Sequence, residues 1–225
     1  MKTVRRIAIW TIIGLVAAFV ILLAALFFFS GSIVGPAPAP LQLPPLGLAT
    51  PSASNASPDG TWMAGDGSVA GFRVPESFLT QSGTIVGRTS AVTGSLVIAH
   101  NEISSGSFQV DLTKLSVVVQ GKQNTTIYQV LDTSRYPQAT LTLTQPIVFA
   151  SLPTTGQTIS SHATAALTLH GVTRPVTFTV MARSNGSVLQ ALGSASVLVS
   201  QWGIQPPVGI HDNATIEFLL VLHRA

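Results

Sequence analysis

Few residues of this chain could do chemistry, and the histidines are the first to consider. Two histidines that bind a metal from one helix face stand four residues apart, and no such pair occurs here. We interpret His170 as a turn residue, with binding of a metal or a lipid head group as the alternative. For His211 and Asp212, which lie in a predicted loop, the alternative is a cation site. The histidines are His100, His162, His170, His211 and His223. We predict no bound metal and no cofactor.

Nucleophiles are equally scarce. The chain has no cysteine, so disulfides, a thiolate nucleophile and a thiolate metal site are excluded. Serines are numerous, but no Gly-x-Ser-x-Gly segment indicates an activated one. A hydrolase or isomerase for a small apolar substrate would need several titratable groups in one cavity, and the sequence offers few. We therefore predict that the protein is not an enzyme.

The distribution of charge argues against a nucleic-acid partner. The net charge of +3 comes from Lys2, Arg5 and Arg6 at the start of the chain. From Asp59 onward, eight basic side chains are balanced by eight acidic ones. A nucleic-acid-binding domain usually carries a basic patch, and none is legible here.

The N-terminal region predicts a membrane anchor. Residues 7–29 contain no charged side chain, and as a helix they would be roughly 34 Å long, enough to cross a hydrocarbon core of about 30 Å. The basic tip, residues 1–6, precedes them, so we expect a cytoplasmic N-terminus and an extracytoplasmic domain at the cell membrane. A cleaved signal peptide is the alternative, although its apolar region is usually shorter, about 7–15 residues.

Residues 30–60 are predicted to be a linker. Seven of the fourteen prolines lie here, among Ala, Ser and Gly, and proline disfavours both helix and central strand. Such a segment favours extended polyproline II backbone. Four leucines, Leu41, Leu43, Leu46 and Leu48, could rest on the membrane or on the domain, and an apolar linker without such contacts is the simpler interpretation.

The remaining chain reads as strand after strand. Apolar and polar residues alternate with the period of two that is typical of half-buried strands. Strands are expected at 69–74, 92–99, 106–112, 139–144, 163–169, 175–182, 188–201 and 215–222, and a short helix near 124–132 with Asn124 as its N-cap. About eight strands without βαβ spacing favour an all-β antiparallel barrel or sandwich.

Several segments together resemble one family. The segment 167–178, LTLHGVTRPVTF, is the most specific. The others occur in the order in which the family has them: 68–74, 86–98, 107–117, 136–144 and 202–222. They resemble the YceI-like (polyisoprenoid-binding, lipocalin-like) domains. The resemblance implies an antiparallel eight-stranded lipocalin-like barrel over residues 61–225, with an elongated apolar cavity for an isoprenoid chain. Two departures concern the ligand: Asp66 is followed by no histidine, and 123–126 lacks the paired Asp and Arg of many members.

Alternation within the strands selects candidate cavity residues. Ten apolar side chains are predicted to face inward: Phe72, Val74, Phe108, Val110, Leu141, Leu143, Phe178, Val180, Phe218 and Leu220. The alternative is that they fill a closed core, because periodicity does not separate a core from a cavity. Each buried methylene contributes about 0.8 kcal/mol, so burial alone could hold a long apolar chain.

We therefore predict a membrane-anchored extracytoplasmic protein that binds an isoprenoid-type lipid, such as a polyprenyl chain or a quinone tail, without bond chemistry. A filled structural or interaction β-domain of the cell envelope, with no ligand, is the alternative. A homodimer remains open.

Overall fold

The computed structural model describes residues 18–22, 36–45, 58–78, 81–119, 122–123, 126–148 and 156–225. Residues 18–22 are helical, and the rest of the predicted anchor, 7–29, lies outside the described residues. Within the ranges just given, no helix is both long and apolar enough to cross a membrane.

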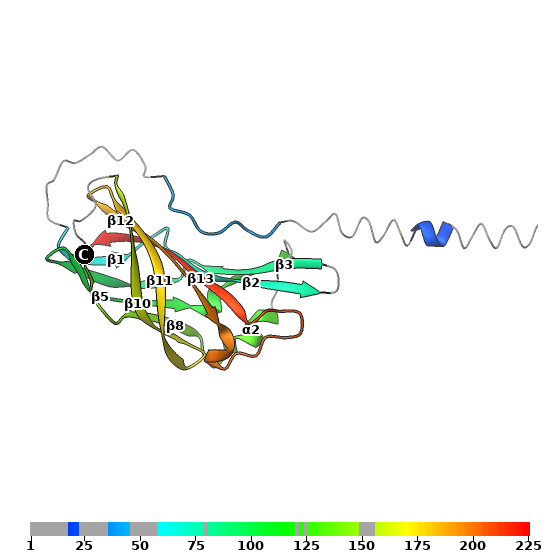
Figure 1. The fold of residues 1–225 in the computed structure, drawn as a ribbon. Helices are drawn as coiled ribbons and strands as arrows, with labels where there is room; N and C mark the ends of the chain where they lie inside the picture. Colours follow the sequence, from blue (N-terminus) through cyan, green and yellow to red (C-terminus); the bar gives the residue numbers. More distant parts are fainter. Residues whose placement is uncertain are drawn as a thin grey trace, which may run out of the picture.

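Eight antiparallel strands close into a barrel (Figure 1). In ring order they are β1 (Gly60–Ala64), β4 (Val92–Ala99), β5 (Glu102–Asp111), β8 (Gln138–Leu143), β10 (Thr158–Leu169), β11 (Val172–Ser184), β12 (Val188–Leu198) and β13 (Asn213–Arg224). β1 closes the ring because it pairs with β4 on one side and with the end of β13 on the other. The predicted all-β barrel is confirmed.

A second group of strands extends the sheet beyond the ring. Its members are β2 (Val69–Phe78), β3 (Gln81–Thr89), β6 (Ser116–Val119) and β7 (Lys122–Gln123), while the short β9 (Ile147–Val148) pairs with β5. β2 continues the course of β1 along β13, pairing over Thr215–Leu219, where β1 pairs with the last residues of β13. The ring alone encloses the half of the barrel near β1. The other half is enclosed by the ring and, in addition, by the β2–β3–β6 sheet.

A two-residue turn fixes the register of the β10–β11 hairpin. β10 and β11 are joined by His170 and Gly171, whose φ angles are 51° and 75°. Two successive positive φ angles make a type I′ turn, whose twist matches that of the strands. This confirms His170 as a turn residue, between the strands that the sequence predicted at 163–169 and 175–182.

Two sequence expectations need correction or qualification. The expected strand 188–201 ends at Leu198, and η2 (Val199–Trp202) follows, because the Asp212 carboxylate accepts hydrogen bonds from the Ser200 N–H and hydroxyl at 2.8 and 2.7 Å. The expected helix is present as α2 (Thr126–Val130), with Ile127 buried. Its predicted cap, Asn124, lies outside the described residues.

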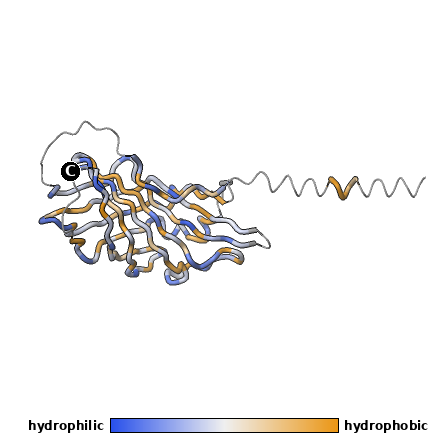
Figure 2. The backbone as a smooth tube through the Cα atoms, turned by 45° about the horizontal axis from the view of Figure 1, so that its top comes forward, coloured by the Kyte–Doolittle hydropathy of each residue, from blue (hydrophilic) through white to orange (hydrophobic). Residues whose placement is uncertain are grey.

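Among the described residues, the barrel interior holds two apolar clusters. Figure 2 shows the alternation of hydrophobic and hydrophilic residues along the strands. The first fills the end where β1 closes the ring, and its centre holds Trp62 and Leu222, which are 2% and 0% exposed. The second lies toward α2, η1 (Leu112–Lys114) and η2, around Phe178 and Trp202. The end around Trp62 is therefore solid, and we call it the closed end.

Candidate functional site: an apolar cavity

A cavity of about 140 Å³ occupies the half of the barrel away from the closed end. Its wall is formed by inward side chains of the barrel strands and of β2 and β3, and residues of α2, η1, η2 and the 204–211 loop complete it. Among the described residues, no polar atom contributes accessible surface to this wall. The cavity can therefore receive an apolar group, but it offers no hydrogen bond inside.

Eight of the ten predicted residues line this cavity. They are Phe72, Val74, Phe108, Val110, Leu141, Phe178, Phe218 and Leu220. Val180 instead packs between the two apolar clusters, and Leu143, paired with Ala165, is half-buried outside the lining. Contact of these side chains with a ligand stays a prediction.

Several inward side chains keep exposed surface. Phe72, Phe108, Leu141 and Phe218 are half-buried although they point into the barrel, whereas the side chains at the closed end are fully buried. An inward residue in a close-packed core would lose nearly all its accessible surface. The surface that these residues retain is the wall of the lumen.

The mouth of the cavity lies between the 204–211 loop and α2. Pro207 and His211 are lining residues that are themselves exposed, and Val130 and Leu131 beside them are half-buried. This loop is tied to β2 because Glu76 forms a bridge with Ile210. The sequence predicted the short helix, but it did not assign the helix or the 204–211 loop to the cavity wall, because a loop carries no periodic signal. The apolar Ile204 and Pro206–Pro207 were the available clue.

Three polar side chains near the mouth, His170, His211 and Asp212, are engaged with the protein itself, whereas the buried Glu76 Oε1 has no hydrogen-bond partner among the described residues. The His211 ring lies 3.0 Å from the Ser77 hydroxyl, and both Asp212 oxygens bind Ser200, so the predicted alternative of a cation site at 211–212 has no free carboxylate. His170 contacts the Trp202 carbonyl at 3.2 Å and packs on Tyr136. No group of three or more potential metal ligands occurs among the described residues.

One carboxyl group near the site has a shifted pKa. The Thr113 hydroxyl donates to Asp111, as does the Thr113 N–H, and these bonds lower the pKa of Asp111 below its ordinary value. Asp111 is the N-cap of η1, which brings Leu112 into the cavity wall. The ionised carboxylate therefore caps η1, which positions Leu112 in the wall.

Comparison with known proteins identifies the relatives of this barrel. Residues 62–222 match the sequence profile of the YceI-like domain. No curated protein sequence matches the chain. A polyisoprenoid-binding domain from Saccharophagus degradans, implicated in plant cell wall breakdown, is 14% identical with a TM-score of 0.57, covering 74% of this chain and 99% of its own. BcnA of Burkholderia cenocepacia is 18% identical with a TM-score of 0.49, covering 68% and 95%.

Proposed function

Because this chain belongs to the YceI-like domain family, we propose that its barrel binds the apolar chain of an isoprenoid-type lipid, a polyprenyl chain or a quinone tail. The observation that carries the proposal is the lumen itself, an apolar cavity whose inward phenylalanines keep accessible surface. A lipid tail needs apolar contact and no hydrogen bond, and this wall supplies only that.

The size of the cavity defines how a lipid would enter. Ligand pockets are commonly about 300–1,000 Å³, so 140 Å³ holds the end of a chain and must widen for more. Each isoprene unit of five carbons gains at most about 4 kcal/mol from burial, before the loss of its freedom is counted. We propose that the terminal units enter first and that the head group remains at the mouth.

The proposed location is the extracytoplasmic face of a membrane. The apolar residues 7–29 after a basic tip support an uncleaved anchor with the barrel on the outer side. Isoprenoid lipids reside in the bilayer, so an anchor keeps the cavity within reach of them. The activity proposed is binding, for carriage, storage or sensing.

A filled structural domain is the second candidate, and the closed end supports it, because Trp62 and Leu222 leave no space there. The mouth half does not fit it, since a filled barrel would have buried Phe72 and Phe218.

Native mass spectrometry of the full chain, released from detergent micelles, distinguishes the two candidates. After incubation with a polyprenol or a long-tailed quinone, we expect an added mass at 1:1 stoichiometry. A chain that stays at its own mass with both probes would overturn lipid binding and favour the filled domain.

A further inference from the structure

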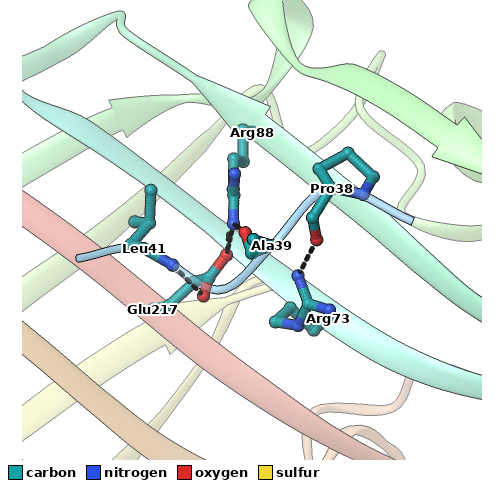
Figure 3. Close-up of polar contacts among 6 residues, drawn as sticks. All are labelled: Pro38, Ala39, Leu41, Arg73, Arg88 and Glu217. Carbon is teal, nitrogen blue, oxygen red and sulfur yellow. Dashed lines mark hydrogen bonds and ion pairs between the residues drawn. The ribbon is translucent and has the colours of Figure 1, made fainter. Parts of the chain in front are cut away.

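The proline-rich residues 36–45 lie against the outside of the barrel (Figure 1). Three hydrogen bonds hold them there (Figure 3). Arg73 Nη1 donates to the Pro38 carbonyl at 2.6 Å, Arg88 Nη2 donates to the Ala39 carbonyl, and the Leu41 N–H donates to Glu217 Oε2 at 3.2 Å. We call residues 36–45 the strap. Two of the four leucines of the predicted linker, Leu41 and Leu43, belong to the strap, and both are half-buried.

The strap site is an ion pair built across three strands. Glu217 on β13 lies opposite Gly71 on β2, and Gly71 lies opposite Arg88 on β3. Gly71 has no side chain, so Arg88 crosses β2 and donates to Glu217 Oε1 from Nε at 3.0 Å and from Nη2 at 2.7 Å. Glu217 is only 3% exposed, and its second oxygen receives the strap.

The site recognises backbone. All three bonds end on main-chain groups of the strap, and proline leaves the carbonyl as the only main-chain polar group at position 38. Because proline also fixes φ near −65°, an extended segment rich in proline loses little freedom on docking. The wall over β2, β3 and β13 is thus matched to an extended proline-rich chain.

The strap has a defined direction. Pro38 binds Arg73, whereas the later residues Ala39 and Leu41 bind Arg88 and Glu217, the cross-strand neighbours of Gly71. Because Gly71 precedes Arg73 in β2, the strap runs antiparallel to β2. β2 runs from Val69 toward the mouth, where Glu76 forms a β-bridge with Ile210 of the 204–211 loop, which we call the mouth loop. The N-terminal end of the strap is therefore the end nearer to the cavity mouth, and in Figure 1 it lies on the side toward which the β2 arrow points.

We propose that the strap turns the mouth of the barrel toward the membrane. The inference rests on the proposed anchor at 7–29. With the strap docked, only residues 30–35 separate that anchor from the barrel, a reach of about 20 Å, whereas a free linker of residues 30–60 would reach roughly 100 Å. Val208, 98% exposed on the mouth loop, then faces the lipid surface. A lipid tail passes from bilayer to lumen without crossing bulk water.

Strap docking is tested by distance measurement between two spin labels on the full chain in nanodiscs. The natural chain has no cysteine, so Gln42→Cys and Ser194→Cys label the strap and the outward face of β12 beside Glu217 without competition. We expect a narrow distance distribution that broadens and lengthens in Arg73→Gln and in Arg73→Gln/Glu217→Gln. Arg174→Gln, which removes a bond to the Gln201 carbonyl away from the strap, should leave it narrow. An equally broad distribution in the parent chain overturns docking.

Orientation is tested on the same nanodiscs with single labels at the two ends of the barrel. Val208→Cys reports the mouth and Met63→Cys, 53% exposed in the parent residue, reports the closed end. Nickel-chelating lipids should broaden the Val208→Cys signal more than that of Met63→Cys, and the double variant Arg73→Gln/Glu217→Gln should abolish the difference. Equal broadening in the parent chain, or a difference that survives in the variant, overturns the proposal.

The two experiments separate this proposal from the proposed function. If the chain does not stay in the nanodisc, the proposed anchor is wrong and so is the proposed orientation of the mouth. The distance between the labels on Gln42→Cys and Ser194→Cys still shows whether the strap is docked. Lipid uptake is read independently by mass. Circular dichroism of each variant confirms that a changed distance does not arise from unfolding.

Discussion

The ring of Phe218 occupies the place that a side chain of Gly193 would take on the neighbouring strand. The two residues are direct cross-strand partners in β13 and β12, and a Cβ on Gly193 would lie 2.1–2.7 Å from three atoms of the ring. Phe72 lies over its own partner, Gly87, in the same way, at 2.5 Å. Because glycine lets each ring lie flat on the wall, these aromatic side chains line the lumen and do not plug it.

Gly193→Ala should therefore narrow the cavity. The new methyl group displaces the Phe218 ring, which packs tilted on Phe178 at 5.5 Å between centroids, and the lumen is the free space beside it. We expect at least a tenfold loss of lipid affinity and a stability loss of about 1–3 kcal/mol from overpacking. Titration followed by native mass spectrometry measures the first, and denaturant unfolding the second.

A matched control for this change is Gly106→Ala. An added Cβ there would meet Leu96 at 3.4 Å, an ordinary contact, so binding should hardly change. Adding Phe218→Ala to Gly193→Ala removes the displaced ring and should restore uptake. Unchanged affinity in Gly193→Ala would show that the ring position does not control the lumen.

Leu141→Trp should block the cavity directly. Leu141 is a half-buried wall residue on β8, and a larger ring there fills the lumen that the tail would enter. We expect loss of the lipid adduct with the barrel still folded. Thr142→Trp on the same strand points outward from an exposed position and should bind as the parent does. Retained binding in Leu141→Trp would place the ligand elsewhere.

The sequence predicted which strand faces point inward, but not the features that depend on contacts distant in the chain. Alternation identified Leu141 and Phe178 because the period of a strand is local. The position of Phe218 over Gly193 depends on the register of β13 against β12, which no single strand encodes. Glu217 and Arg88 lie 129 positions apart and look like ordinary surface charges until the sheet brings them together. The 204–211 loop was not assigned to the cavity because a loop has no periodic signal that would show which side chains point inward.

The two apolar clusters should contribute to stability independently. The Trp62 indole donates to the Pro58 carbonyl at 2.9 Å at the closed end, and the Trp202 indole donates to the Leu167 carbonyl at 3.1 Å in the other cluster. Trp62→Phe and Trp202→Phe each remove one such bond, and we expect each to lower the free energy of unfolding by about 1–3 kcal/mol. Because the residues belong to separate clusters, the double variant should be additive within about 0.5 kcal/mol. A larger deviation in urea unfolding would mean that the clusters are coupled.

Acid should weaken the η1 end of the cavity wall through Asp111. Hydrogen bonds from Thr113 lower the pKa of this carboxyl group in the folded chain, so its ionised form stabilises the fold at pH values above the unfolded pKa of about 3.9. That contribution is lost as the pH falls through the lower, folded pKa. A ¹³C NMR titration of the Asp111 carboxyl should show its midpoint below the ordinary value, and Thr113→Ala, which removes the largest cause, should move it upward. Asp111→Asn should flatten the acid dependence of stability in this range, and an unchanged midpoint in Thr113→Ala would contradict the assigned cause.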